Sequence, residues 1–254
     1  LALVPEEEKI RIHLRIGRLI MEDTRPERLS GRIFNIVNHL NQGAVLLDAT
    51  AEKHRLAELN LLAGKKAKGA AAFSQAAEYL KAGEALLSDA DWPDQYALMF
   101  DLKKNRMECE YLSLNYDEAE ALFGILLDRA VSDLDRAAVY NQKMVMLAGL
   151  AKHEDALVIG LTGLGLLGVP LPGSATLVDV LRRLTALKIR LFRCDPEELL
   201  HLPVIEDPRR LLILDMLMNV SLSAYFCQPY LATWLALKIF ALTLKHGNSK
   251  VSPF

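Results

Sequence analysis

The chain has 254 residues, of which 52% are hydrophobic and 24% are charged, and its formal net charge is −2. This composition excludes a mainly disordered chain, and the balanced charge gives no support for a nucleic-acid partner or an anionic membrane surface. Aromatic residues make up only 7% of the chain, and the many alanines and leucines favour helices over strands.

The three cysteines stand far apart, at Cys109, Cys194 and Cys227, and no pair has the spacing of a zinc or redox motif. We therefore expect reduced, half-buried thiols and a cytoplasmic protein. The N-terminal residues lack the charge order and the apolar core of a signal peptide. Because the chain starts with Leu1 and stops shortly after an apolar helix, we expect it to be a fragment of a longer protein.

Apolar residues recur at helical spacing through most of the chain. They predict helices over 5–22 and 27–42, helix pairs over 57–87, 95–129 and 135–167, and single helices over 176–193, 209–226 and 230–246. Thr50 is predicted to cap the helix that leads into the first pair, whose corner is expected over 68–72. The segment VPLPGSA is the strongest break, and a connector with one short helix is expected over 194–210. No alternating strand pattern is longer than a few residues, so the predicted fold class is all-α, with roughly ten to twelve helices.

The three helix pairs carry small residues in the same register. Ala76, Ala119 and Ala156 are equivalent, at spacings of 43 and 37 residues, and Gly64 and Gly83 take the other small positions of the first pair. The tetratricopeptide (TPR) repeat has such a pattern, with a period of about 34 residues. Repeat units of this kind bury their apolar faces only by stacking on neighbours. The sequence therefore predicts a TPR-like solenoid of antiparallel helix pairs with a right-handed superhelix.

The run GLGLLG, from Gly163 to Gly168, formally matches the dinucleotide-binding pattern G-x-G-x-x-G. That chemistry needs a strand before the glycines and a helix after them, so that the helix N-terminus meets the pyrophosphate. Here a helical pattern precedes the run and residues 169–172, VPLP, follow it, so we predict packing and capping glycines. No Gly-Lys-Ser/Thr sequence of a Walker loop occurs.

Scattered histidines and acidic pairs give no catalytic constellation. The six histidines form no H-x-x-x-H pair, and His39 is expected to make a hydrogen bond between helices rather than to bind a metal. Glu108 and Glu110, like Glu118 and Glu120, stand two residues apart on helices and are interpreted as solvated faces. The sequence predicts no catalytic, cofactor-binding or metal-binding residue.

A basic cluster, Lys65, Lys66 and Lys68, stands at the end of the first helix of the pair over 57–87. We interpret these lysines as favourable charge at a helix C-terminus. The alternative is a docking patch for an acidic partner.

The last two helices are very apolar, which raises the question of a membrane. Neither has 18 uninterrupted apolar residues, because Asp215, Asn219 and Lys238 interrupt them. We therefore predict buried repeat helices and no membrane partner.

Several runs resemble one family of signalling proteins. They are IRIHLRIGRLIMED, RIFNIVNHLNQG, AEKHRLAELNLLAGKKAKGAAAFSQAAEYLKAG, NYDEAEALF and LLGVPLP. They are similar to the region that follows the ATPase module in bacterial multi-sensor hybrid histidine kinases, proteins with an AAA/STAND-type NTPase, a TPR-like region and a histidine-kinase module. The resemblance covers essentially the whole chain, but none of the family's catalytic motifs falls inside it. It implies three parts: 1–43, the tail of a preceding NTPase-associated subdomain; 44–168, degenerate TPR-like repeats; and 174–254, further helical repeats.

These observations predict a non-catalytic scaffold for protein interaction and signal transmission. Its expected partners are the adjacent NTPase and kinase domains of the same protein or a regulator protein, with self-association through the C-terminal helices as a further expectation. The alternative is a small-molecule sensor that uses the concave face of the solenoid, where Trp92, Tyr96, Tyr111 and Tyr116 are candidate lining residues. A hydrolase or transferase with an unrecognised site is a third hypothesis.

Overall fold

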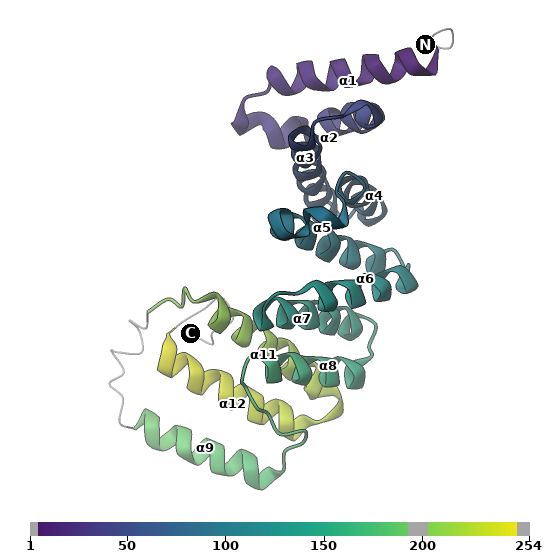
Figure 1. Ribbon diagram of the computed structural model, residues 1–254. Coiled ribbons are helices and arrows are strands. Elements are labelled where there is room, and N and C mark those ends of the chain that lie inside the picture. The colour runs from purple at the N-terminus through teal and green to yellow at the C-terminus, as the bar shows by residue number, and fades with distance from the viewer. Residues whose placement is uncertain (1–4, 193–202, 248–254) are drawn as a thin grey trace. The chain divides into compact units, whose positions relative to one another are not determined.

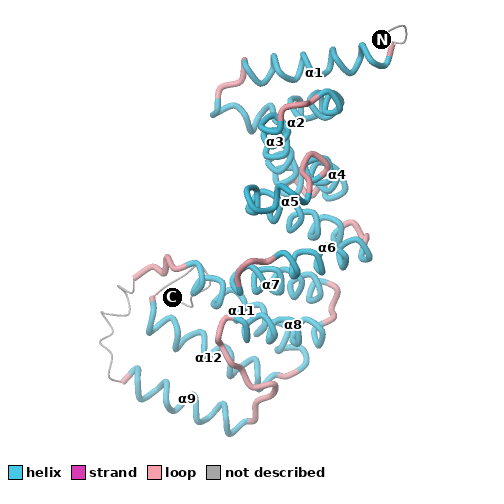
Figure 2. Tube along the Cα trace, in the orientation of Figure 1, coloured by secondary structure: helices cyan, strands magenta, loops and turns pink. Residues whose placement is uncertain are grey.

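A computed structural model describes residues 5–192 and 203–247, and over these residues the regular structure is helical (Figures 1 and 2). It contains eleven α-helices and no strand within the described ranges, so the all-α class is confirmed. The helices are α1 (Glu6–Glu22), α2 (Pro26–Gly43), α3 (Thr50–Gly69), α4 (Phe73–Glu84), α5 (Trp92–Leu112), α6 (Tyr116–Arg129), α7 (Asp133–Gly149), α8 (His153–Leu166), α9 (Leu177–Leu191), α11 (Pro208–Cys227) and α12 (Pro229–His246). Cys194, His201 and the short helix expected in the connector lie outside the described residues.

The chain divides into two compact units, residues 1–128 and residues 129–254. The first unit contains α1 to α6, and the second contains α7 to α12. The functional division expected at residues 43 and 168 stays a prediction, because compactness alone does not assign roles to these segments.

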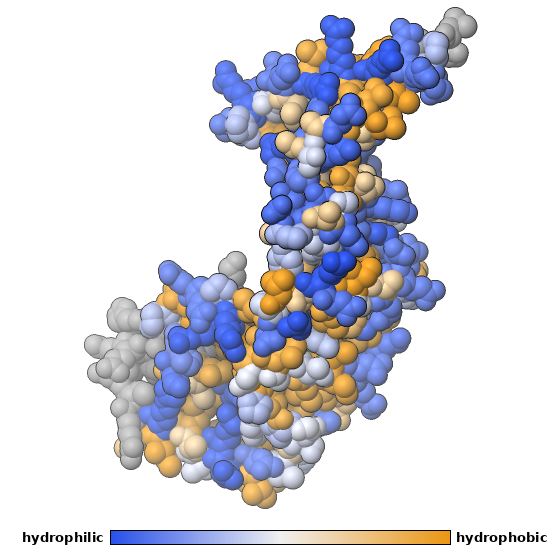
Figure 3. All heavy atoms as spheres, in the orientation of Figure 1, coloured by the Kyte–Doolittle hydropathy of each residue, from blue (hydrophilic) through white to orange (hydrophobic). Residues whose placement is uncertain are grey.

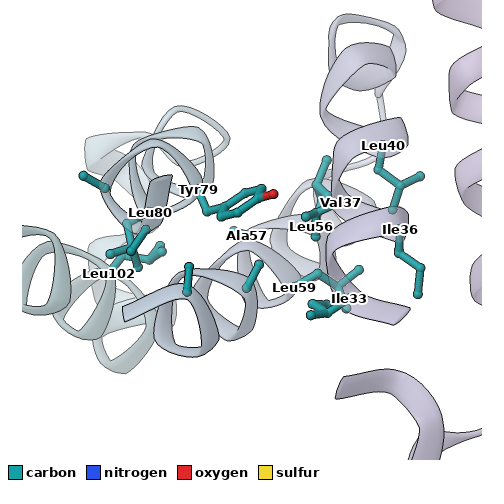
Figure 4. Packing of buried hydrophobic residues seen from close by; sticks show 14 of the residues in the cluster. Ile33, Ile36, Val37, Leu40, Leu56, Ala57, Leu59, Tyr79, Leu80 and Leu102 are labelled. Carbon is teal, nitrogen blue, oxygen red and sulfur yellow. The ribbon is translucent and has the colours of Figure 1, made fainter. Parts of the chain in front are cut away.

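The core of the first unit runs through α2, α3 and α4 and reaches α5. Its buried apolar residues include Ile33, Ile36, Val37, Leu40, Leu56, Leu59, Leu80 and Leu102. Figure 4 shows these side chains lying between the helices, with those of α2 meeting those of α3 and Leu80 beside Leu102. Figure 3 shows hydrophilic residues together with some hydrophobic ones over α1, and the buried residues of this helix are Leu14 and Gly17.

Glycines mark the places where neighbouring helices cross. A Cβ added to Gly64 of α3 would lie 2.6 Å from Cγ of Leu80 in α4, and one added to Gly83 of α4 would lie 3.3 Å from the carbonyl oxygen of Ala57 in α3. Gly64, the later of these two residues of α3, meets Leu80, the earlier of the two in α4, so the two helices run antiparallel. This confirms the prediction that these glycines space the helices.

The same geometry recurs between α7 and α8. A Cβ added to Gly160 would lie 2.3 Å from Sδ of Met144, and one added to Gly163 would lie 2.8 Å from Cβ of Tyr140. Gly163 and Gly165 lie inside helix α8, and Gly168 follows its end with a φ of +67°. The interpretation of GLGLLG is confirmed for Gly163, which packs, and for Gly168, which follows the helix end, whereas a Cβ added to Gly165 would meet nothing within 4 Å.

Three helix pairs turn at equivalent corners. Ala71, Leu114 and Ala151 have φ values of +57°, +68° and +58°, and each stands two residues before the second helix of its pair. At each corner the following residue donates its backbone N–H to the carbonyl five residues earlier, as in Ala72 to Ala67, at 2.9–3.0 Å. This is the Schellman hydrogen-bond pattern that ends helices, although glycine usually occupies the left-handed position.

The corners share the register of the small residues. Ala71, Leu114 and Ala151 are separated by 43 and 37 residues, the same spacings as between Ala76, Ala119 and Ala156. These three alanines are buried. The predicted repeat register is therefore a property of the folded backbone and not only of the composition.

Helix α11 forms the centre of the second unit. It packs against α7, α8 and α12, and its buried residues include Leu214, Met216, Leu217, Val220 and Ala224. By length and composition α11 is apolar enough to cross a membrane, with a mean hydropathy of 1.3, and 33% of that window is buried inside the unit. It is the one such helix among the described residues.

One predicted boundary was wrong. Thr50 is the first residue of α3, and Ala49 occupies the capping position with no side-chain hydrogen bond. Alanine has no oxygen to accept from the first-turn amides, so this helix starts without the side-chain cap that the sequence suggested.

Candidate functional site

An ionic cluster on α5 overturns one sequence interpretation. Arg106 donates from Nη1 to Oε2 of Glu84 at 3.1 Å, from Nε to Oε1 of Glu110 at 3.2 Å, and from Nη2 to Glu118, while Lys103 also contacts Glu84 at 3.0 Å. Glu110 is buried, so its interpretation as part of a solvated face was wrong; α5 packs that face against α4. Burial alone would lower the pKa of Arg106, but Glu84, Glu110 and Glu118 raise it above its ordinary value.

The three lysines at the end of α3 contact neighbouring helices. Lys65 Nζ lies 2.8 Å from Oδ2 of Asp101, and Lys68 Nζ lies 2.7 Å from Oδ1 of Asn105 and 2.9 Å from Oε2 of Glu108. The later lysine of α3 contacts the later residues of α5, so α3 and α5 run parallel. Lys65 and Lys68 therefore join α3 to α5, which leaves less free charge for an acidic partner than the alternative interpretation requires.

Lys66 and the histidine pair also connect helices. Lys66 Nζ donates to the backbone carbonyl of Ser30 on α2. His13 Nδ1 and His39 Nδ1 are 2.8 Å apart, and the rings stack at 4.9 Å between α1 and α2. The predicted inter-helix role of His39 is confirmed. No group of three or more His, Cys, Asp and Glu side chains in the described ranges is placed to hold a metal ion.

The four aromatic residues proposed for a sensor groove fall into two groups. Trp92 and Tyr96 make a tilted ring contact near the start of α5, with centroids 6.0 Å apart, whereas Tyr111 and Tyr116 make an edge contact at 5.2 Å across the α5–α6 corner. Fifteen residues of helix separate Tyr96 from Tyr111, which is about 22 Å of helix axis. The four rings therefore do not line one groove.

A cleft of about 590 Å³ lies between α9 and α12 in the second unit. Helix α9 contributes Arg182, Arg183 and Arg190, which follow one another at helical spacing on one side, and α12 contributes Trp234 and Leu237. The apolar side of α9 packs on the apolar side of α12. The arginines of α9 alternate in the sequence with its apolar residues, which places them beside this contact.

Trp234 contacts two cations, of which Arg183 lines the cleft. The guanidinium carbon of Arg183 lies 4.0 Å from the centroid of the Trp234 ring, and Lys238 Nζ lies 5.5 Å from the same centroid. Both distances are in the range of cation–π contacts. Arg190 is used differently, since it donates to the backbone carbonyls of Ala241 and Leu244 at 3.4 and 3.3 Å and joins α9 to α12.

The described residues that line the cleft carry more positive than negative charge. Burial lowers the pKa of Arg183, and burial together with the charge of Arg183 lowers the pKa of Lys238. Among the described residues neither cation has an ion pair, and Nε of Arg183 is buried without a hydrogen-bond partner. The one carboxylate that lines the cleft, Asp179, accepts hydrogen bonds from Thr176 at the start of α9.

The sequence interpretation missed this cleft. It predicted a helix over 176–193 but did not connect the arginines of this helix to Trp234 and Lys238. Two signals were present: arginines at 182, 183 and 190 on one side of a helix, and a tryptophan four residues before a lysine on another. Neither pattern indicates that the two helices are neighbours.

Comparison with known proteins points to the signal-transduction kinases. Over an alignment of 151 residues the chain is 26% identical to hybrid signal transduction histidine kinase G of Dictyostelium discoideum. This alignment covers 50% of the chain and 4% of that kinase, so the chain corresponds to a small part of the relative. No family model matches the chain. No solved structure matches it.

Proposed function

We propose that this chain is a non-catalytic, TPR-like helical-repeat scaffold that transmits signals through protein contacts within a large signalling kinase. The observation that carries the proposal is the shared register of the three corners at Ala71, Leu114 and Ala151 with the buried alanines that follow them. Repeats of this kind contact mainly their neighbours, so a change at one end can pass along the stack.

The order of helix contacts supports a solenoid in each unit. In the first unit α3 is antiparallel to α4 and parallel to α5, as the lysine contacts require. In the second unit α8 is antiparallel both to α7 and to α11, because Gly160 faces Met144 and Val220 while Gly163 faces Tyr140 and Met216. Alternation of this kind is what stacked helix pairs produce. A right-handed superhelix is the handedness we propose.

An exposed apolar patch supports a protein partner. Leu222, Tyr225 and Phe226 near the end of α11 and Tyr230 at the start of α12 are each more than half exposed. Contiguous exposed apolar groups of this kind mark interaction sites in folded proteins. We propose that this patch, defined by these four residues, contacts an adjacent domain or a second copy of the chain in the cytoplasm.

The relation to a kinase rests on the sequence similarity to the Dictyostelium histidine kinase. The test of the non-catalytic role is to incubate the purified chain with radiolabelled ATP. We expect no hydrolysis and no phosphoryl transfer above the level of the heat-denatured chain. ATP turnover that disappears with unfolding would contradict the proposal.

A small-molecule sensor is the second candidate. The aromatic residues first considered for it do not share a groove, but the cleft between α9 and α12 has the volume of an ordinary ligand site. A ligand in that cleft is compatible with a scaffold, since the patch on α11 and α12 lies on different residues.

A further inference from the structure

We propose that the cleft between α9 and α12 binds a small phosphate-bearing anion through the guanidinium groups of Arg182 and Arg183. This inference goes beyond the scaffold function and stands or falls independently of it. The cleft is lined by residues from both helices and has a volume of about 590 Å³, which lies inside the range of about 300–1,000 Å³ that is usual for ligand sites.

The first argument is an unsatisfied donor. Nε of Arg183 is buried and has no hydrogen-bond partner. A buried polar group of this kind is rare in folded proteins and indicates a missing partner, such as a ligand or an ion. The guanidinium carbon also lies over Trp234, 4.0 Å from the ring centroid, so this contact positions the group before a ligand arrives.

The second argument is uncompensated charge. Lys238 lies beside the same ring, at 5.5 Å from its centroid, and burial together with the positive charge of Arg183 lowers the pKa of Lys238. Among the described residues that line the cleft, Asp179 is the one carboxylate beside Arg182, Arg183 and Arg190, so positive charge is in excess. An anion between these groups would relieve the repulsion and replace the lost hydration.

The chemistry of the cations selects phosphate. Guanidinium groups present planar donor pairs that match phosphate oxygens, and two arginines with a nearby lysine suit a ligand with at least two negative charges. The cleft has no cysteine, histidine or free carboxylate among its lining residues.

The test uses the fluorescence of Trp234, one of the two tryptophans in the chain. In a Trp92→Phe background the protein is titrated with inorganic phosphate and with pyrophosphate at constant ionic strength. We expect a saturable change in emission, because the anion alters the contact between Arg183 and the ring. Arg183→Gln should weaken binding by about tenfold, the loss of one hydrogen bond to a charged group.

Two further variants make the result decisive. Arg136→Gln removes an arginine that is 39% exposed on α7 of the same unit, and it should leave the affinity within about twofold because surface pairs contribute little. If Arg183→Gln does not fold, Lys238→Met replaces it, and this variant should weaken pyrophosphate binding without lowering the melting temperature. Absence of saturable binding, or equal affinity in these variants and the parent, would overturn the proposal.

A second arm identifies the source of the phosphate. Co-sedimentation is measured with vesicles of phosphatidylcholine, with and without phosphatidic acid. Binding of soluble pyrophosphate alone would assign a soluble ligand to the cleft. Retention by phosphatidic acid vesicles that is lost in Arg183→Gln would assign a lipid headgroup to the same residues, and retention that survives in Arg183→Gln would count against the cleft.

Discussion

At the scale of single residues, glycines determine how closely the helices approach. Gly43, the last residue of α2, faces α1: a Cβ there would lie 2.5 Å from Cβ and 2.9 Å from Cα of Leu14. Backbone atoms cannot move aside as a flexible side chain can. In contrast, Gly31 on the same helix has nothing within 4 Å of an added Cβ.

These two glycines make a matched pair of substitutions. Gly43→Ala should lower the free energy of unfolding by about 1–3 kcal/mol, the usual cost of overpacking. Gly31→Ala should raise it by about 0.5–1 kcal/mol, because alanine loses less entropy than glycine in a helix. Urea denaturation of both variants measures this, and equal effects would show that α1 and α2 are not packed as closely as described.

Cys109 gives a second prediction at this scale. Burial raises the pKa of its thiol to about 11, despite the opposing effect of Lys68. The thiol is therefore protonated in the folded protein at pH 8, where thiols in unfolded chains begin to ionise. Raising the pH from 8 to 10 should accordingly favour the unfolded state, because only the unfolded thiol loses its proton in that range.

Alkylation mapped by mass spectrometry measures how readily the Cys109 thiol reacts in the folded and the unfolded chain. With iodoacetamide at pH 8, Cys109 should stay unmodified in the native protein and become modified in urea. Modification of Cys109 in the native protein at the rate seen in urea would contradict the burial of this residue.

At the scale of elements, the cluster around Arg106 connects three helices. It joins Glu84 of α4, Glu110 of α5 and Glu118 of α6. Arg106→Met removes the cationic partner of the poorly exposed Glu110 and one of the two cations that contact Glu84, and it should cost about 3–5 kcal/mol, as for other broken buried pairs. Arg136→Met, which breaks an exposed pair with Asp133 on α7, should cost less than about 1 kcal/mol. Thermal unfolding of the two variants compares them, and similar melting temperatures would argue that the cluster is solvated.

The exposed patch on α11 and α12 gives the second prediction for elements. Replacing Leu222 and Tyr225 together by serine should abolish concentration-dependent association without lowering the melting temperature, because both side chains are exposed. Val178→Ser, which removes an exposed apolar side chain of α9, is the control and should change neither. Sedimentation equilibrium measures the association. If the double variant associates as the parent does, another surface is responsible.

At the scale of the whole molecule, local patterns predicted the helices, and contacts between distant segments were harder to predict. Helical spacing of apolar residues placed α1, α2, α9, α11 and α12 to within a few residues, and small residues predicted the crossings. The left-handed corners were less evident, because Ala71, Leu114 and Ala151 replace the glycine that normally marks them. The sequence predicted the first of these corners, over 68–72, and the backbone angles identified all three.

The sites that were missed depend on pairing between helices. Glu110 was interpreted as solvated from the pattern of its own helix. Its partner Arg106 lies on that helix, but the other carboxylates of the cluster, Glu84 and Glu118, come from neighbouring helices. Arg183 and Trp234 meet only because α9 packs on α12. Periodicity shows which face of a helix is apolar but not which helix covers it, so neither the ionic cluster nor the cleft follows from one sequence.

The central proposal is that the chain is a non-catalytic helical part of a larger signalling kinase. The most direct measurement is to sequence the complete open reading frame that encodes it. We expect an NTPase module with a Walker loop on the N-terminal side and a histidine-kinase module on the C-terminal side. A reading frame that encodes neither module would contradict the proposal.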